Sequence, residues 1–210
     1  MDKLTVLPRI PDWPDRAMQM LAFWLGYQCS LGLRANLSEG AITWELCRLI
    51  SSLLSKEQFV HTEVPYAKIP ALSTHADVAG RRYRADIVIT SHSKMPTAGE
   101  RFPAGTVSEV IEVKHNGSGI AQVWSDINYM SRISTGAVNC PRMFLVYASA
   151  NEWPGKFVKI DGTAIRTLQH TENQSPYRVR CVRKALRLTP KIGAKIHGNY
   201  AVLIEVFPTI

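Results

Sequence analysis

The sequence predicts one α/β domain, because short apolar runs rich in β-branched residues alternate with segments whose apolar residues recur at helical spacing. The clearest strands are residues 84–89 and 109–114, each followed by turn-forming residues. The clearest helix is residues 120–130, where apolar side chains return every three or four positions. At 210 residues, 46% hydrophobic and 20% charged, the chain can bury one core.

Two helices are expected before the first strand. The first follows a proline-rich arm at residues 1–14 and can be capped by Asp12 or Asp15. The second can be capped by Ser38, and its apolar residues recur at helical spacing from 42 to 53.

The predicted compartment is the cytoplasm, with no membrane partner. Residues 1–14 hold aspartates and prolines in place of the apolar run of a secretory signal. Residues 17–33 carry no charge, but they include glycine and glutamine and fall short of the roughly 20 residues that a bilayer requires, so a buried or dimer-forming helix is preferred. The four cysteines lack CxxC spacing, which favours free thiols in a reducing compartment.

The rest of the expected core consists of strands and one long connection. Residues 59–65 read as a strand that ends at a proline, and the turn-rich residues 91–108 read as a loop. Residues 142–148 are almost continuously apolar, as is typical of a strand buried on both faces. The order helix, three strands, helix, strand predicts a mixed sheet with helices on both sides.

Alternation along the strands gathers charged side chains on one face. Glu112 and Lys114 share a face of their strand, while Val113 points to the other. If the strand that carries Asp86 is its neighbour, two carboxylates and one ammonium converge on one patch. Charges buried without partners are costly, so this convergence indicates a function.

Asp86, followed 26 residues later by Glu112-Val113-Lys114, resembles the PD-(D/E)xK nuclease superfamily, whose mark is an Asp on one strand and a Glu-x-Lys on the next. Ala85 stands where the superfamily usually has proline. The resemblance covers roughly residues 38–150 and implies a restriction-endonuclease-like catalytic core. Residues 1–37 would then be an N-terminal arm and helix, and 151–210 a basic, β-rich extension of the same single nuclease domain.

The resemblance implies a Mg²⁺-dependent DNA endonuclease, with Mn²⁺ as a substitute, that leaves a 5′-phosphate and a 3′-hydroxyl. Such enzymes serve restriction, phage defence or mobile-element processing. In this reading Asp86 and Glu112 bind the metal, and the Val113 carbonyl is a third ligand. Lys114 orients or deprotonates the attacking water, with its pKa lowered by desolvation beside the metal.

Two helix residues extend this expected site. Glu45 lies at the border of the apolar stripe of its helix, and in many superfamily members a Glu from this helix joins the metal site; the alternative is an exposed acid paired with Arg48. Gln122 matches the place where several related nuclease groups have a polar residue facing the site. The alternative for Gln122 is a solvated helix face.

The net charge of +8 favours a polyanionic partner, here DNA, although solubility alone could account for it. Between Glu172 and Glu205 there are seven basic residues and no acid, and strands are expected at 156–160, 176–183 and 200–207. A clustered basic face suits phosphate contacts, with a solvated surface as the alternative. The expected nucleic-acid-binding residues are Arg82, Arg84, Arg178, Arg180, Arg183 and Lys184.

Two alternatives remain open at this point. The chain could be a noncatalytic nucleic-acid-binding or assembly protein that keeps a nuclease-like fold. It could cleave RNA in place of DNA. One small domain has one cutting site, so double-strand cleavage would require a homodimer, a partner subunit or two sequential nicks.

Overall fold

The computed structural model describes residues 13–32, 37–73, 75, 78, 83–186 and 198–209. In this part of the chain, seven strands form one mixed sheet in the order β1-β2-β3-β4-β7-β6-β5. Its elements are α1 (Trp13–Ser30), α2 (Glu39–Leu53), β1 (Phe59–Pro65), the short 3-10 helix η2 (Tyr66–Lys68), β2 (Arg84–Thr90), β3 (Val107–His115), η3 (Asn116–Ser118), α3 (Ile120–Ser134), β4 (Arg142–Ser149), β5 (Gln169–His170), β6 (Pro176–Leu186) and β7 (Gly198–Val206).

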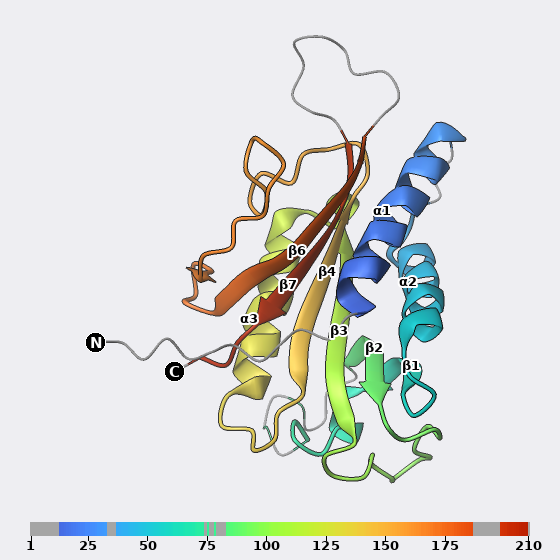
Figure 1. Cartoon of the computed structure of the whole chain (residues 1–210). Helices are drawn as coiled ribbons and strands as arrows, with labels where there is room; N and C mark the ends of the chain where they lie inside the picture. The colour runs from blue at the N-terminus through green and yellow to red at the C-terminus, as the bar shows by residue number, and fades with distance from the viewer. Residues whose placement is uncertain are drawn as a thin grey trace.

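Helices cover both faces of the sheet (Figure 1). Helices α1 and α2 pack on one face, over Ile87, Ile111 and Val113. Helix α3 packs on the other face, over Val88 and Val110. Residues that follow one another on a strand thus enter two different cores, as alternation requires. The expected α/β class, with a mixed sheet flanked by helices, is confirmed.

Local sequence explains where the two N-terminal helices begin. Pro14 and Asp15 lie in the first turn of α1, where proline loses no hydrogen bond and an acid meets the positive end of the helix dipole. Ser38 caps α2 as expected, since its hydroxyl accepts a hydrogen bond of 3.2 Å from the Ala41 amide. The alternative cap, Asp12, lies outside the described residues.

Strands β2 and β3 separate at Asp86 and Glu112, the two acids that the sequence predicted for the site. Their antiparallel ladder runs from Thr90 to Ile87 on β2 and stops there, opposite Ile111. Beyond this point β2 continues its pairing with β1, and β3 continues its parallel pairing with β4 as far as His115. Asp86 and Glu112 are the next residues on each strand. The two strands therefore form a fork with a carboxyl group on each arm.

Strand β6 contains an irregularity that changes the direction of its side chains. Val179 pairs with Ile204 and Cys181 pairs with Leu203, so Arg180 is an extra residue opposite the β7 ladder. Consequently Val179 enters the core under α3 and Cys181 enters the core under α1. Regular alternation would have sent both side chains to the same face of the sheet, and the bulge breaks it.

The C-terminal third matches the expectation in part. The strands expected at 176–183 and 200–207 are present as β6 and β7. The prediction of a strand at 156–160 is wrong, because only an isolated bridge between Val158 and Ala164 forms there. None of the helices in the described ranges has the length and apolarity needed to cross a bilayer.

Candidate functional site

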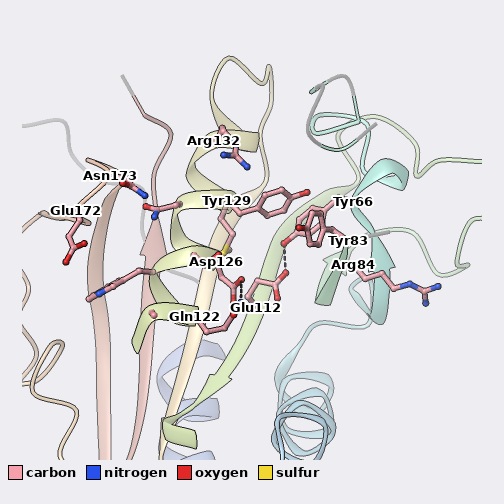
Figure 2. Close-up of a pocket in the computed structure, with 15 residues that line it drawn as sticks. Tyr66, Tyr83, Arg84, Glu112, Gln122, Asp126, Tyr129, Arg132, Glu172 and Asn173 are labelled. Carbon is pink, nitrogen blue, oxygen red and sulfur yellow. Dashed lines mark hydrogen bonds between the residues drawn. The ribbon is translucent and has the colours of Figure 1, made fainter. Parts of the chain in front are cut away.

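A cleft of about 580 Å³ lies between the fork and helix α3 (Figure 2). Glu112 of β3 lies between Tyr66 of η2 and Asp126 of α3. Polar and aromatic side chains bound the cleft. Glu112 comes from the sheet face that α3 covers, and Asp126 comes from α3 itself. Its main side chains are Tyr66, Tyr83, Arg84, Glu112, Gln122, Trp124, Asp126, Asn128, Tyr129, Arg132, Glu172 and Asn173.

The two predicted acids meet at the fork. Asp86 accepts a hydrogen bond of 2.7 Å from the Val113 amide, so its carboxylate replaces the ladder bond that is lost where the strands separate. The Glu112 carboxyl lies close enough to Asp86 for the two groups to shift each other's pKa. Tyr66 donates a hydrogen bond of 2.5 Å to the other side of Glu112, at Oε1. The convergence expected from alternation is therefore present.

Burial and mutual repulsion raise the pKa values of Asp86 and Glu112. Burial raises the pKa of Asp86, and the Val113 amide and the Lys114 charge only partly offset this. Burial, followed by the charge of Asp86, raises the pKa of Glu112 well above its ordinary value. Two carboxyls so close to one another cannot both ionise without a cation, so the pair shares a proton.

The acid pair fits a hard divalent cation. A bound cation would replace the shared proton and remove the repulsion that raises both pKa values. Mg²⁺ keeps several waters and typically binds to one or two protein carboxylates, so Asp86 and Glu112 form a sufficient donor set. No group of three or more His, Cys, Asp or Glu side chains with metal-binding geometry occurs among the residues that the structure describes. The predicted third ligand, the Val113 carbonyl, accepts a hydrogen bond of 3.2 Å from Lys114 Nζ.

Lys114 lies between two further carboxylates. Its Nζ is 3.1 Å from Glu39 Oε2 at the start of α2 and 3.3 Å from Asp126 Oδ2 on α3. Burial alone lowers the pKa of the amine, but the nearby carboxylates, Asp126 first, outweigh burial and the pKa is raised. Glu39 and Asp126 are thus counterions of the amine, and the lowered Lys114 pKa expected beside a bound metal stays a prediction.

Gln122 acts on the site through a neighbour. It is exposed and lies along the cleft, and its Nε2 donates a hydrogen bond of 3.2 Å to Asp126 Oδ1. Asp126 in turn pairs with Lys114. The structure thus places Gln122 beside the predicted site as a residue that positions the partner of the lysine.

Glu45 does not join the acids at the fork in the described contacts. It forms a two-pronged ion pair with Arg48, with distances of 2.6 and 2.9 Å, as in the alternative that the sequence left open, but it is buried and not exposed as that alternative expected. The expected contribution of Glu45 to a metal site is contradicted by this geometry. The acid of α2 that reaches the site is Glu39, six residues earlier, which contacts both Lys114 and Ser118.

Two of the expected phosphate-binding arginines lie against an acid of β7. Arg180 sits at the bulge and pairs with Glu205, and its side chain is only 9% exposed. Arg178 stands directly across the ladder from the same Glu205, which Arg142 also contacts at 2.9 Å. The predicted phosphate contact of Arg180 is contradicted by its burial, and Arg178 is directed to the same cluster.

The remaining basic residues have different surroundings. Arg183 pairs with Asp15 of α1, and both side chains are partly exposed, so the pair adds little stability. Lys184 lies beside Lys159 and Arg166 in a groove of about 730 Å³. Arg84 borders the cleft and extends outward from Glu112 (Figure 2). Arg82 lies outside the described residues, so for Arg82, Arg84 and Lys184 phosphate binding stays a prediction.

Glu109 is a second buried acid on β3, but it belongs to the opposite face of the sheet from Glu112. Its side chain is 2% exposed, and burial raises its pKa to about 7 although the Arg142 charge opposes the shift. The folded state therefore binds this proton more tightly than the unfolded chain, and stability falls as the pH rises from about 4.5 through 7.

We expect Glu109→Gln to stabilise the protein by about 3 kcal/mol at pH 8 and to have little effect at pH 4, since one pKa unit is worth ~1.4 kcal/mol. Urea unfolding at the two pH values measures this difference. An equal change at both values would contradict the raised pKa.

Sequence patterns differ in how well they could have identified Asp126, Glu39 and Tyr66 as residues of the site. Asp126 lies one helical turn after Gln122, so i,i+4 spacing places both on one face of the helix. Glu39 is the first residue of α2 and resembles an ordinary helix-start acid. Tyr66 carries no local signal, because it reaches Glu112 across 46 residues of sequence.

Comparison of the chain with family models, with curated proteins and with solved structures returned no match.

Proposed function

We propose that this protein is a metal-dependent nuclease that hydrolyses phosphodiester bonds of DNA in the cleft between the fork and α3. The observation that carries this proposal is the meeting of Asp86 and Glu112 where β2 and β3 separate, with Lys114 on the same strand. The resemblance to the PD-(D/E)xK superfamily and the order of helices and strands support it. The net charge of +8 suits a polyanionic substrate.

Each residue of the proposed site has a separate role. Asp86 and Glu112 would hold Mg²⁺, which when bound supplies an acidified water and relief of negative charge on the phosphate. Tyr66 fixes the orientation of Glu112 through its short hydrogen bond. Lys114 keeps its proton, because surrounding carboxylates raise its pKa, and it offers positive charge to the phosphate or to the attacking water.

Glu39 and Asp126 hold the Lys114 amine from two sides, at 3.1 and 3.3 Å. This arrangement restricts the rotation of a flexible side chain before the substrate arrives, which lowers the entropic cost of the reaction. Gln122 supports Asp126 from the exposed side of α3. In this arrangement the lysine offers a positioned positive charge to the phosphate or to the attacking water.

The test is cleavage of supercoiled plasmid with Mg²⁺ or with EDTA. The wild-type chain is expected to nick plasmid only with Mg²⁺, and Asp86→Asn is expected to remove this activity because it removes an anionic ligand. Glu109→Gln is the matched control, since it neutralises a buried acid on the neighbouring strand but on the opposite face of the sheet. Equal cleavage by wild type and Asp86→Asn would rule out the proposed site.

A further inference from the structure

A row of tyrosines leads from the acid pair to the mouth of the cleft. Tyr66 meets Tyr129 edge-on with ring centres 5.5 Å apart, and Tyr129 lies 4.9 Å from Tyr83. The Arg132 guanidinium lies 5.8 Å from the centre of the Tyr129 ring. Exposure rises along the row, from 1% at Tyr66 to 49% at Tyr83. The outermost ring thus presents much of its surface to the cleft (Figure 2).

The backbone holds the outermost ring in place. The Tyr66 amide donates a hydrogen bond of 3.2 Å to the Tyr83 carbonyl, next to the last β1–β2 ladder pair, Pro65 and Arg84. Tyr83 is therefore tied to the arm of the fork that carries Asp86. A half-exposed aromatic ring on a fixed backbone, beside a cleft, has the properties of a platform on which a nucleic-acid base stacks.

The depth of the acids restricts what can reach them. Glu112 is only 9% exposed and lies between Tyr66 and Asp126. In a duplex the bases are stacked inside and cannot meet an aromatic wall without being extruded, which costs a few kcal/mol. An unpaired strand can turn its bases outward at little cost, and aromatic side chains accept any base because each base has a π face.

Charges around the cleft are consistent with an unpaired strand. Arg84 and Arg132 lie at its rim, and Glu112 and Asp126 lie toward its floor; the exposed acid Glu172 also lines the cleft and partly opposes the arginines. Rim arginines attract a phosphate backbone from solvent. The acids at the floor repel phosphate until a cation or a shared proton neutralises them. The strand is thus held mainly by rim charge and by stacking.

We propose that the cleft takes single-stranded nucleic acid, including the unpaired end of a duplex, with one base stacked on Tyr83 beside Tyr129. The proposal names the substrate class of the proposed nuclease and rests on that function for the role of the acids. Stacking itself needs neither metal nor hydrolysis, so the two claims can fail separately. A stacked base at the mouth would direct the adjoining backbone toward Asp86 and Glu112.

The test measures binding in EDTA, where no cleavage occurs. The probe is a short single-stranded DNA with 2-aminopurine in its central positions, whose fluorescence falls when the base stacks on a ring. A hairpin with the same strand paired is the comparison. We expect the single strand to bind at least tenfold more tightly than the hairpin and to lose fluorescence on binding.

Variants locate the stacking ring. Tyr83→Leu is expected to weaken single-strand binding about tenfold and to restore fluorescence, as stacking is worth roughly 1–3 kcal/mol per base. Tyr83→Phe keeps the ring and should bind as the wild type does. Tyr27→Leu is the matched control, because Tyr27 is a 60% exposed tyrosine on α1, which covers the opposite sheet face.

The outcomes separate the two claims. Equal affinity for single strand and hairpin, or unchanged single-strand binding by Tyr83→Leu, would overturn the proposed substrate class even if plasmid is nicked. Stacking on Tyr83 without Mg²⁺-dependent cleavage of either plasmid or the single strand would support the single-strand site and refute hydrolysis.

Discussion

Glu112→Gln is expected to abolish cleavage and at the same time to stabilise the metal-free protein at pH 8. Loss of an anionic ligand should lower the cleavage rate about a thousandfold, because a bound cation stabilises transition-state charge by several kcal/mol and each ~1.4 kcal/mol is tenfold. Plasmid nicking and thermal unfolding in EDTA measure the two effects.

The gain in stability follows from the raised pKa of Glu112. Burial and the Asp86 charge raise it, so the folded state holds a proton that the unfolded chain releases near its ordinary pKa of 4.5. Stability therefore falls as the pH rises above that value, and the neutral amide avoids the loss. Glutamine also keeps an oxygen for the Tyr66 hydroxyl. We expect the free energy of unfolding to rise by roughly 1–3 kcal/mol at pH 8, which is comparable to the cost of leaving a buried polar group unsatisfied. At pH 4 we expect almost no gain.

Glu109→Gln separates the two effects of this substitution. It also neutralises a buried glutamate of β3 and is also expected to stabilise the protein at high pH. Because its side chain lies on the opposite sheet face, cleavage should be unchanged. If both variants lost cleavage, general damage to β3 would explain the result better than a metal site.

Lys114→Met is expected to abolish cleavage and, in contrast, to destabilise the fold. Without the ammonium, Glu39 and Asp126 face one another with no cation between them. Removing one partner of a fully buried pair costs about 3–5 kcal/mol. Here the carboxylate side chains are 37% and 21% exposed, so we expect a smaller loss of about 1–3 kcal/mol.

A second substitution distinguishes stability from catalysis. Lys114→Met combined with Asp126→Asn should recover part of the lost stability, because one uncompensated charge is removed, but it should not recover cleavage. Urea unfolding and plasmid nicking of the single and double variants provide the comparison. Recovery of cleavage by the double variant would show that Lys114 serves only the fold.

Sequence periodicity predicted the parts of the site that depend on short-range rules. Alternation places Glu112 and Lys114 on one strand face, and the neighbouring strand brings Asp86 to them. The same rule sends Glu109 to the other face, and the structure has it there. These inferences need only the direction of side chains on a strand and the adjacency of two strands.

Other parts of the structure depend on contacts that no local pattern contains. The bulge at Arg180 reverses the expected side-chain direction, and the acid that binds this arginine is Glu205, on the next strand. The basic C-terminal segment therefore has acidic partners in space that are distant in sequence, including Asp15. Helical spacing singled out Glu45, whereas the α2 residue that reaches Lys114 is Glu39, which is set by how the helix start meets the end of β3.

The most direct test of the central claim is a crystal of the protein soaked with Mn²⁺ and measured at the manganese absorption edge. The account predicts an anomalous peak bound by carboxylate oxygens of Asp86 and Glu112 at about 2.1–2.2 Å, as for a hard six-coordinate cation, and no such peak in Asp86→Asn. A peak elsewhere, or none while the two carboxyls remain close to one another, would contradict it.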